Sequence, residues 1–261
     1  MDVISVHAGI AGTIFAGQVR HFPSVGSTNL LALEAAQAGS RRGVWVADEQ
    51  TAGRGRGGHG WHSAAGDGLY VSALVAPALP MSMALWLSLA TGLAARTAIA
   101  EATSMTVDIR WPNDLLLHGR KCGGILIETA VEAEMLRYAV IGIGINVNHG
   151  SFPAELETIA TSLRIQSGGE ISREALLAAL LRSLDKEIAL LVQEHRGEIA
   201  ATGLLERFAE ASSWVRGKRV RVDEGGGYTG VTSGLDSRGF LLVDGDDGVR
   251  HTVLSGGVRE D

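Results

Sequence analysis

One short loop of the sequence combines residues that could together bind an anion. The segment Gly53–Trp61 contains five glycines, two arginines, a histidine and a tryptophan. Glycines let the backbone take positive φ angles and approach a ligand closely, and arginine provides permanently charged, forked donors that fit carboxylate and phosphate oxygens. The loop is therefore predicted to cradle an anionic ligand, with Arg54 and Arg56 as donors.

Two alternatives for this loop must be weighed. Glycines 53, 55 and 58 match the G-x-G-x-x-G pattern of dinucleotide-binding folds. That motif needs a helix that begins inside it and an acidic residue about 20 positions further on. Here residues 60–68 cannot sustain a helix, and Leu69–Val75 is typical of a strand. A flexible glycine linker is the other alternative, but the alternating arginines add nothing to a plain turn.

The composition excludes several classes of protein. With 261 residues, of which 46% are hydrophobic, the chain can form one large domain or a large and a small one. Its net charge of −6 argues against a general nucleic-acid binder. The single cysteine, Cys122, excludes an internal disulfide and a multi-cysteine metal site. Asp2 stands where an export signal carries positive charge, so a cytoplasmic location is expected. The apolar run Met83–Ala100 contains polar interruptions and predicts a buried helix rather than a membrane span.

Polar residues stand at the ends of the elements next to the loop. Ser27 or Thr28 is predicted to cap a helix within residues 24–40. A helix N-terminus is also a ready site for a polar ligand. The predicted strand Val44–Ala47 leads directly to Gln50.

The middle of the chain predicts short strands joined by tight turns. A strand over Thr106–Arg110 precedes a proline-fixed turn that presents Asn113 and Asp114. Two hairpins follow, and the last return strand, Leu136–Ile145, delivers Asn146. Short connections imply antiparallel pairing. The predicted fold class is therefore α+β, with a mixed or antiparallel sheet and flanking helices.

The C-terminal part differs in pattern. Helical spacing of leucines after Ser172 predicts a long helix, and a second helix is expected over about Glu198–Ala211. From Trp214 onward, short alternating runs separated by glycine-rich and aspartate-rich turns predict a small β-barrel. We therefore predict a catalytic domain over residues 1–213 and a small barrel domain over 214–261.

The candidate site contains cations but no nucleophile. The sequence has no Ser-His-Asp arrangement, zinc-binding histidine pair or Walker lysine motif, and histidines 7, 21, 149, 195 and 251 lack ligand spacing and are expected at the surface. Arg54, Arg56 and Lys121 favour chemistry by charge neutralisation, as in attack on a phosphoryl group. Side-chain oxygens of Asn113, Asp114 and Asn146 are of the kind that ligates Mg²⁺.

Four blocks of the sequence resemble the signature blocks of biotin–protein ligases, in the family's order and with similar spacing. They are Gly53–Trp61, Arg110–Asp114, Lys121–Glu128 and Gly142–Asn146. The resemblance extends from about Phe22 to the C-terminus. It implies a catalytic domain similar to class II aminoacyl-tRNA synthetases and biotin ligases, followed by a C-terminal barrel of SH3-like type.

The resemblance implies a two-step activity. Biotin and ATP would form biotinyl-5′-AMP and pyrophosphate, in the presence of Mg²⁺, and the biotinyl group would then pass to a lysine of an acceptor. The acceptor is usually the biotin carboxyl carrier protein domain of acetyl-CoA carboxylase.

Roles for individual residues also follow from the resemblance. The implied catalytic residues are Lys121, Arg56, Arg54 and Asp114. The implied biotin site comprises Ser27, Thr28, Asn29, Gln50, Arg54, Gly55, Arg56, Lys121, Gly123 and Gly124. The implied ATP site comprises Gly57, Gly58, His59, Trp61, Asn113 and Asn146, with Mg²⁺ near Asn146 and Asp114.

Two rival functions are weighed against this one. A lipoate or octanoate ligase shares the fold class and the acyl chemistry, but its members lack the double-arginine loop beside this Trp-Pro-Asn-Asp turn. A non-catalytic sensor of biotin or its adenylate would not need the phosphate-neutralising Lys121. The expected protein is a monofunctional ligase that binds neither DNA nor a membrane, because the residues before Ser24 are too few for a winged-helix domain. A homodimer stays possible.

His59 stands where the family often carries a third loop arginine. Because histidine changes charge near neutral pH, retention of the adenylate is predicted to depend on pH. The rate of adenylate release should therefore change between about pH 6 and 8. A flat profile over that range would contradict the prediction.

Overall fold

The computed structural model describes residues 1–255 and 257–261, and its largest unit is a seven-stranded sheet. The strand order is β1-β2-β3-β7-β6-β5-β4, and every pair is antiparallel except β1 with β2. The predicted mixed sheet is therefore confirmed. Its strands are β1 (Val19–Phe22), β2 (Gly43–Ala47), β3 (Gly68–Val75), β4 (Asp108–Arg110), β5 (Asp114–Leu117), β6 (Arg120–Glu132) and β7 (Met135–Asn146).

Two predicted hairpins build the centre of this sheet. The β5–β6 turn is His118-Gly119, with φ of 49° and 76°, and the β6–β7 turn is Ala133-Glu134, with φ of 49° and 66°. Paired left-handed residues give two-residue turns whose twist matches that of the strands. The sequence pattern predicts a first turn over residues 118–121, but the turn is only two residues long, so Lys121 lies on β6. The predicted strand over Thr106–Arg110 is also shorter, since pairing begins only at Asp108.

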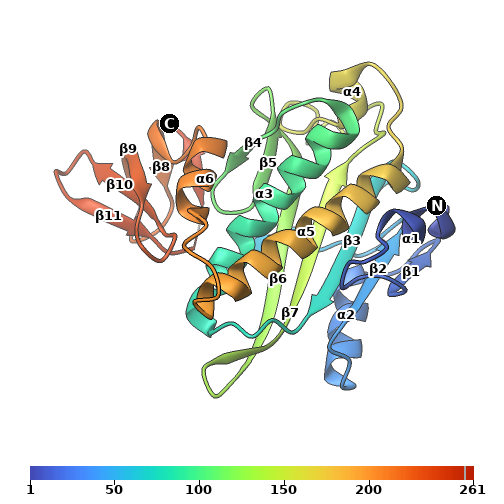
Figure 1. The fold of residues 1–261 in the computed structure, drawn as a ribbon. Coiled ribbons are helices and arrows are strands. Elements are labelled where there is room, and N and C mark those ends of the chain that lie inside the picture. Colours follow the sequence, from blue (N-terminus) through green and yellow to red (C-terminus); the bar gives the residue numbers. More distant parts are fainter. Residues whose placement is uncertain (256) are drawn as a thin grey trace.

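Helices cover both faces of the sheet (Figure 1). On one face, α3 (Ala84–Thr103) and α5 (Arg173–His195) pack together over the main apolar core, with α1 (Val3–Gly9) beside α5. On the other face, α2 (Thr28–Gln37) packs against β2, β3 and β7 around a smaller apolar cluster. The side-chain hydroxyl of Ser172 accepts a hydrogen bond from the amide of Ala175 and thereby caps the start of α5.

Only one helix among the described residues is long and apolar enough to cross a membrane. It spans Met81–Thr103, and 56% of its most apolar window is buried inside the protein. Because α3 packs against α5, α6 and the sheet, burial in the core accounts for its apolar character.

A second, five-stranded sheet lies at one end of the molecule, next to α6 (Figure 1). Helix α6 (Leu204–Ala211) begins later than predicted, after Gly203, which has a φ of 64°. The short helix α4 (Leu163–Ser167) was not predicted. The second sheet has the order β11-β10-β9-β8-β12 and comprises β8 (Arg216–Val222), β9 (Tyr228–Leu235), β10 (Leu241–Gly245), β11 (Arg250–Val253) and β12 (Val258–Glu260).

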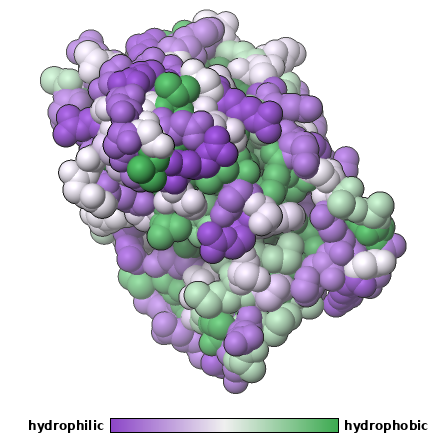
Figure 2. Space-filling view, turned by 90° about the vertical axis from the view of Figure 1, so that its left-hand side faces the viewer, coloured by the Kyte–Doolittle hydropathy of each residue, from purple (hydrophilic) through white to green (hydrophobic). Residues whose placement is uncertain are grey.

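The two sheets share one apolar core. Val220, Leu241 and Val253 of the second sheet belong to the same buried cluster as the helices of the first. The indole Nε1 of Trp111 also donates a hydrogen bond to the carbonyl of Gly239, at 2.9 Å. A domain boundary near Ser213 stays a prediction. The outer face of this end of the molecule is mostly hydrophilic (Figure 2).

Replacing Trp111 by Phe should weaken the contact between the two sheets. The substitution removes the indole donor, leaves the Gly239 carbonyl without its partner and creates a small void in a site that is 3% exposed. We expect a loss of about 1–3 kcal/mol in the free energy of unfolding, measured by urea denaturation. Trp86→Phe is the matched control, because the indole of Trp86 makes no hydrogen bond within the described residues. Equal stability of the two variants would contradict the prediction.

Candidate functional site

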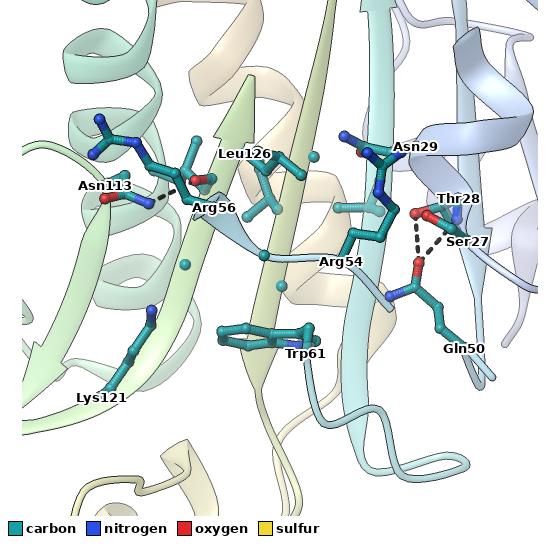
Figure 3. Close-up of a pocket in the computed structure, with 17 residues that line it drawn as sticks. Ser27, Thr28, Asn29, Gln50, Arg54, Arg56, Trp61, Asn113, Lys121 and Leu126 are labelled. Atoms are coloured by element: carbon teal, nitrogen blue, oxygen red, sulfur yellow. Dashed lines mark hydrogen bonds between the residues drawn. The ribbon is translucent and has the colours of Figure 1, made fainter. Parts of the chain in front are cut away.

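One pocket gathers most of the residues that the sequence singled out. It lies over β6 and β7, between the start of α2 and the loop after β2, and Figure 3 shows its labelled side chains converging on one space. The predicted residues that line it are Ser27, Thr28, Asn29, Gln50, Arg54, Gly55, Arg56, Trp61, Asn113, Lys121 and Gly124. The predicted residues that do not line it are Gly57, Gly58, His59, Asp114, Gly123 and Asn146.

The pocket has two ends of different character (Figure 3). Residues Ser27–Asn29, Gln50 and Arg54 lie at one end. Lys121 and Asn113 lie at the other, with Arg56 above them, and the ring of Trp61 lies between. Neutral amides and hydroxyls dominate the first end, whereas cations dominate the second.

The start of α2 is capped from another part of the chain. The side chain of Ser27, the N-cap residue, makes no capping hydrogen bond. Instead, Gln50 Oε1 accepts hydrogen bonds from the Thr28 amide at 2.8 Å and from the Thr28 hydroxyl at 3.1 Å. Gln50 therefore orients the helix end, and its own amide is fixed with the oxygen toward α2.

Ser72 lies beneath this end of the pocket, holds two of its lining residues, and was not predicted from the sequence. It lies on β3 with no exposed surface, and its hydroxyl is 2.8 Å from the Thr28 hydroxyl and 2.5 Å from Asn29 Oδ1. The signal was a serine inside the apolar run Leu69–Val75, where a polar side chain must find buried partners.

The end of the pocket beside α2 has more hydrogen-bond acceptors than donors. Three contacts connect Asn29 Oδ1, Ser72 Oγ, Thr28 Oγ1 and Gln50 Oε1 in series. The two hydroxyls supply one hydrogen each, so at most two of the three contacts are hydrogen bonds at once. A ligand with N–H groups could donate hydrogen bonds to these oxygens, for which the protein supplies too few donors.

The arginine loop folds back on itself. Trp61 donates its amide hydrogen to the carbonyl of Gly53 at 2.9 Å, and Gly55 donates to His59 at 2.7 Å. Gly57 and Gly58, with φ of 66° and 81°, form the tip. His59 and these two glycines lie outside the pocket, so the loop presents only its arginines, Gly55 and Trp61 to the ligand space.

Trp61 lies on a platform made by glycines of β6 and β7. Gly124 and Gly144 pair directly across the two strands. A Cβ added at Gly144 would lie 2.6 Å from the indole, and one at Gly124 would lie 3.1 Å from it. The ring can therefore approach the sheet only because both positions lack a side chain. Within the described part of the chain, its buried Nε1 has no hydrogen-bond partner.

Lys121 is held by a carboxylate at the cationic end. Its Nζ lies 2.5 Å from Asp114 Oδ1 and 5.4 Å from the centre of a Trp61 ring. The second oxygen of Asp114 accepts hydrogen bonds from Nε and Nη2 of Arg110, at 3.1 and 2.5 Å. Asp114 therefore fixes Lys121 from behind rather than facing the pocket itself.

The backbone of Lys121 is fixed as well. Its amide donates to the carbonyl of Ile159 at 2.8 Å, and its carbonyl accepts from Thr161 at 2.9 Å. A lysine on a strand between two such contacts is less free than one in a turn.

Arg56 is the most desolvated of the loop cations. Burial lowers the pKa of its guanidinium, while the negative charges of Asp114 and Glu224 oppose that shift. The arginine nonetheless stays charged at every physiological pH. A half-buried cation that faces few fixed anions is well placed to interact with an anionic ligand.

The side chains predicted to hold a metal are fixed by contacts with the rest of the protein. The side-chain amide of Asn146, which is 5% exposed, donates to the carbonyl of Thr161 at 3.0 Å, and that of Asn113 donates to Ile125 at 2.9 Å. Among the described residues no group of three or more His, Cys, Asp or Glu side chains could hold a metal ion.

One histidine expected at the surface is buried. His149 is 1% exposed, stacks on Phe152 with ring centres 5.0 Å apart and lies 3.5 Å from the Tyr70 hydroxyl. Burial lowers the pKa of His149 to about 4, so this histidine is neutral. The surface expectation was wrong because the side chain fills space beneath the chain that follows Trp61. Cys122 is also fully buried, and burial raises the pKa of its thiol to about 12.

The geometry of the pocket defines a class of site. A donor-poor recess joined to a cluster of cations suits a ligand with a polar head at one end and an anionic group at the other. Such a site is typical of enzymes that activate a carboxylate.

Comparisons with known proteins agree with this class. Residues 22–146 match the Biotin/lipoate A/B protein ligase family, and residues 216–258 match the Biotin protein ligase C terminal domain. The bifunctional ligase/repressor BirA of Bacillus spizizenii is 36% identical over 229 residues, which are 87% of this chain and 69% of that protein. A biotin–[acetyl-CoA-carboxylase] ligase of Mycobacterium tuberculosis is 35% identical over 240 residues, 89% of this chain and 84% of that protein.

A solved structure shares the architecture. The biotin protein ligase from Aquifex aeolicus in complex with biotin and ATP superposes with a TM-score of 0.77 at 27% identity, covering 94% of this chain and all of that one. The chain belongs to the biotin protein ligase family. The predicted fold class, including the β-rich C-terminal part, is confirmed.

The glycine platform generates a prediction. Gly144→Ala should push the indole of Trp61 off the sheet, because the new methyl group would lie 2.6 Å from the ring. Overpacking of this kind costs about 1–3 kcal/mol, and the emission of Trp61 should shift toward that of a solvated indole. Both effects are measurable by denaturation and by the fluorescence difference from a Trp61→Phe background. Gly150→Ala is the control, since nothing lies within 4 Å of the added Cβ there. Identical behaviour of the two alanine variants would argue against the platform.

Proposed function

We propose that the protein is a biotin–protein ligase that activates biotin with ATP and transfers the biotinyl group to a lysine of an acceptor protein. One observation carries the proposal. The pocket joins a recess of hydrogen-bond acceptors to a group of cations, with the aromatic ring of Trp61 between them. Biotin has the matching polarity, because its ureido N–H groups lie at one end and its carboxylate at the other.

The recess is assigned to the bicyclic head of biotin. The ureido group offers two N–H donors, and the series from Asn29 to Gln50 lacks hydrogens for its oxygens. Lipoate and octanoate have no N–H donor at the corresponding end, so they would leave these acceptors unsatisfied at a cost of about 1–3 kcal/mol. This difference favours biotin within a family whose description covers both biotin and lipoate ligases.

The cationic end is assigned to the reacting groups. In the first step a carboxylate oxygen of biotin attacks the α-phosphorus of ATP, the bond from that phosphorus to the bridging oxygen breaks, and pyrophosphate leaves. Negative charge gathers on the carboxylate and α-phosphate as they approach each other. Lys121 and Arg56 would neutralise that charge, and such electrostatic stabilisation is the main contribution a protein makes to phosphoryl chemistry.

Asp114 would act on this step through Lys121. Its carboxylate holds Nζ at 2.5 Å and is itself held by Arg110. Asn113, whose amide is fixed by Ile125, and Trp61 are proposed to contact the nucleotide. We assign no direct contact to Asn146, because its amide is committed to Thr161 inside the protein.

In the second step the ε-amine of the acceptor lysine attacks the carbonyl carbon of the mixed anhydride. The bond from that carbon to the phosphate oxygen breaks, AMP leaves, and the amine loses a proton. The acceptor is proposed to be the biotin carboxyl carrier protein domain of acetyl-CoA carboxylase or a similar biotin-dependent enzyme, by analogy with the names of two relatives. A cytoplasmic location follows from that acceptor.

We propose that the arginine loop opens and closes over the pocket as ligands enter and leave. Opening of the loop would admit the substrates, and its closure would shield the hydrolysable anhydride from water. The glycines at the tip of the loop provide the freedom for this motion.

Magnesium fits this site poorly as an ion held by the protein. Both oxygens of Asp114 are engaged by cations, and Asn146 is 5% exposed and does not line the pocket. We therefore propose that Mg²⁺ enters as its ATP complex and that phosphate and water oxygens supply its ligands, as is common for this ion.

The test is pyrophosphate–ATP exchange by the purified protein with biotin, lipoate and octanoate in turn, with and without Mg²⁺. Exchange with biotin alone is expected, and it should require Mg²⁺. Exchange with lipoate or octanoate would move the protein to the rival acyl ligases. No exchange with any of the acids would favour a sensor and refute the proposed activity.

Lys121→Ala should reduce the rate of adenylation by about 10²–10³-fold, by analogy with the loss of one transition-state donor. Stability should change little, because the side chain is 34% exposed and Asp114 keeps Arg110 as a partner. Single-turnover formation of biotinyl-5′-AMP measures the rate. Lys186→Ala, at an exposed position of α5, is the matched control. Near-normal adenylation by the Lys121 variant would show that its role is misassigned.

A further inference from the structure

Glu128 connects the start of α2 with the arginine loop. It lies on β6 opposite Val140 of β7, and its side chain is 26% exposed. Its Oε2 accepts a hydrogen bond from Asn29 Nδ2 at 2.9 Å, and its Oε1 lies 3.6 Å from Nη2 of Arg54. One carboxylate thus contacts both the start of α2 and the arginine loop.

The contact with Asn29 fixes which atom that residue offers to a ligand. An ionised carboxylate accepts hydrogen bonds and cannot donate them. Asn29 must therefore turn Nδ2 toward Glu128, which leaves Oδ1 directed at Ser72 and the recess. Without the carboxylate, the amide could rotate and present a donor where the acceptor-rich recess needs an oxygen.

Close packing reinforces this orientation. A Cβ added at Gly142 would lie 2.2 Å from Asn29 Oδ1, so the amide lies flat on the backbone of β7. The remaining freedom of Asn29 is rotation of its amide plane, and Glu128 and Ser72 determine that rotation from opposite sides.

The contact with Arg54 places that cation at the head-group end. Figure 3 shows Arg54 pointing toward Asn29, away from Lys121 and Asn113. The Arg54 side chain is 52% exposed, and Glu128 is its only ion-pair partner among the described residues. Because Asn29 holds Glu128 in place, Glu128 in turn keeps Arg54 above the recess.

Both ends of the arginine loop are therefore attached to the floor of the pocket. Arg54, near its beginning, is held through Glu128 and Asn29. Near its end, the carbonyl of Trp61 accepts a hydrogen bond from Ser63 at 3.2 Å, and Ser63 is 3.3 Å from Gln50 Nε2. The residues that would contact the head group are the same ones that secure the loop.

We propose that Glu128 is a positioning residue that orients the Asn29 amide for the ureido head group and holds Arg54 as a cover over it. This inference rests on the proposed function, since it names how that site recognises and retains biotin. Arg54 then acts at the opposite end of the pocket from Lys121, and Glu128 influences substrate affinity rather than the chemical step.

The experiment compares Glu128→Ala, Glu128→Gln and the wild type, with Glu132→Gln as the control. Glu132 lies on the same strand, but its side chain is 74% exposed and its nearest cation, Arg137, is 3.8 Å away. For each protein we would measure biotin affinity by calorimetry without ATP, KM and kcat in pyrophosphate exchange, and the release rate of biotinyl-5′-AMP.

The alanine variant should bind biotin about tenfold more weakly, because Asn29 loses the partner that orients it. Its kcat at saturating biotin should stay within about twofold of the wild type. The glutamine variant can still accept from Asn29, so its biotin affinity should stay within about threefold. It loses the ion pair with Arg54, and release of the adenylate should become about two- to fivefold faster.

Other results would overturn the inference. Wild-type biotin affinity in the alanine variant would refute the role toward Asn29, and a loss confined to kcat would place Glu128 in the chemical step instead. Unchanged or slower adenylate release by the glutamine variant would refute the role toward Arg54. If the alanine variant fails to fold, the glutamine variant still decides that second role. An inactive wild type would refute the proposed function, whereas an active wild type with unaffected variants would refute only this inference.

Discussion

The site depends on holding several cations close together before any anionic ligand arrives. Like charges in a partly buried pocket repel each other and lose hydration, so a fixed carboxylate beside a cation stabilises it. Asp114 provides one for Lys121 and is itself balanced by Arg110, while Glu128 provides one for Arg54. These carboxylates lie behind or beside the cations, which keeps the cationic side chains available to the ligand. A substrate can therefore supply the missing negative charge without displacing a buried protein group.

The sheet makes this arrangement possible. Asp114 starts β5 and pairs with Gly124, while Glu128 lies four residues further along β6, so the two carboxylates stand at opposite ends of the pocket. Between them, Gly124 and Gly144 leave a flat surface on which the indole rests. The same glycines weaken the strands in isolation, because each gives up side-chain packing and adds backbone entropy. The long ladder between β6 and β7 and the helices packed beneath it compensate for that loss.

Much of the site could be predicted from the sequence because its polar residues stand where periodic patterns break. Arg54, Lys121 and Asn113 follow or interrupt strands, and the prolines and glycines beside them mark turns. Ser72 and the burial of His149 could not be predicted in this way. Ser72 becomes important only because β3 pairs with β7 and places it beneath α2, more than forty residues away along the chain. His149 is buried only because the chain after Trp61 folds over it. Local patterns carry no information about such contacts.

The predicted start of α6 was wrong for a related reason. The residues before Gly203 have helical propensity, but the helix begins only after this glycine.

The division of the pocket into two ends also limits how its residues can act on one another. A substitution at the acceptor-rich end alters the binding of the neutral head group. It can affect the reacting phosphate only through the bound ligand or through the arginine loop. The loop is the shorter route, because Arg54 and Arg56 are separated by one residue yet lie at opposite ends of the pocket (Figure 3). Contacts of the head group with Arg54, which Glu128 already holds, would further restrict this arginine and thereby reduce the freedom of Arg56. Only Gly55 separates the two arginines, so this short link would couple recognition of the head group to retention of the adenylate.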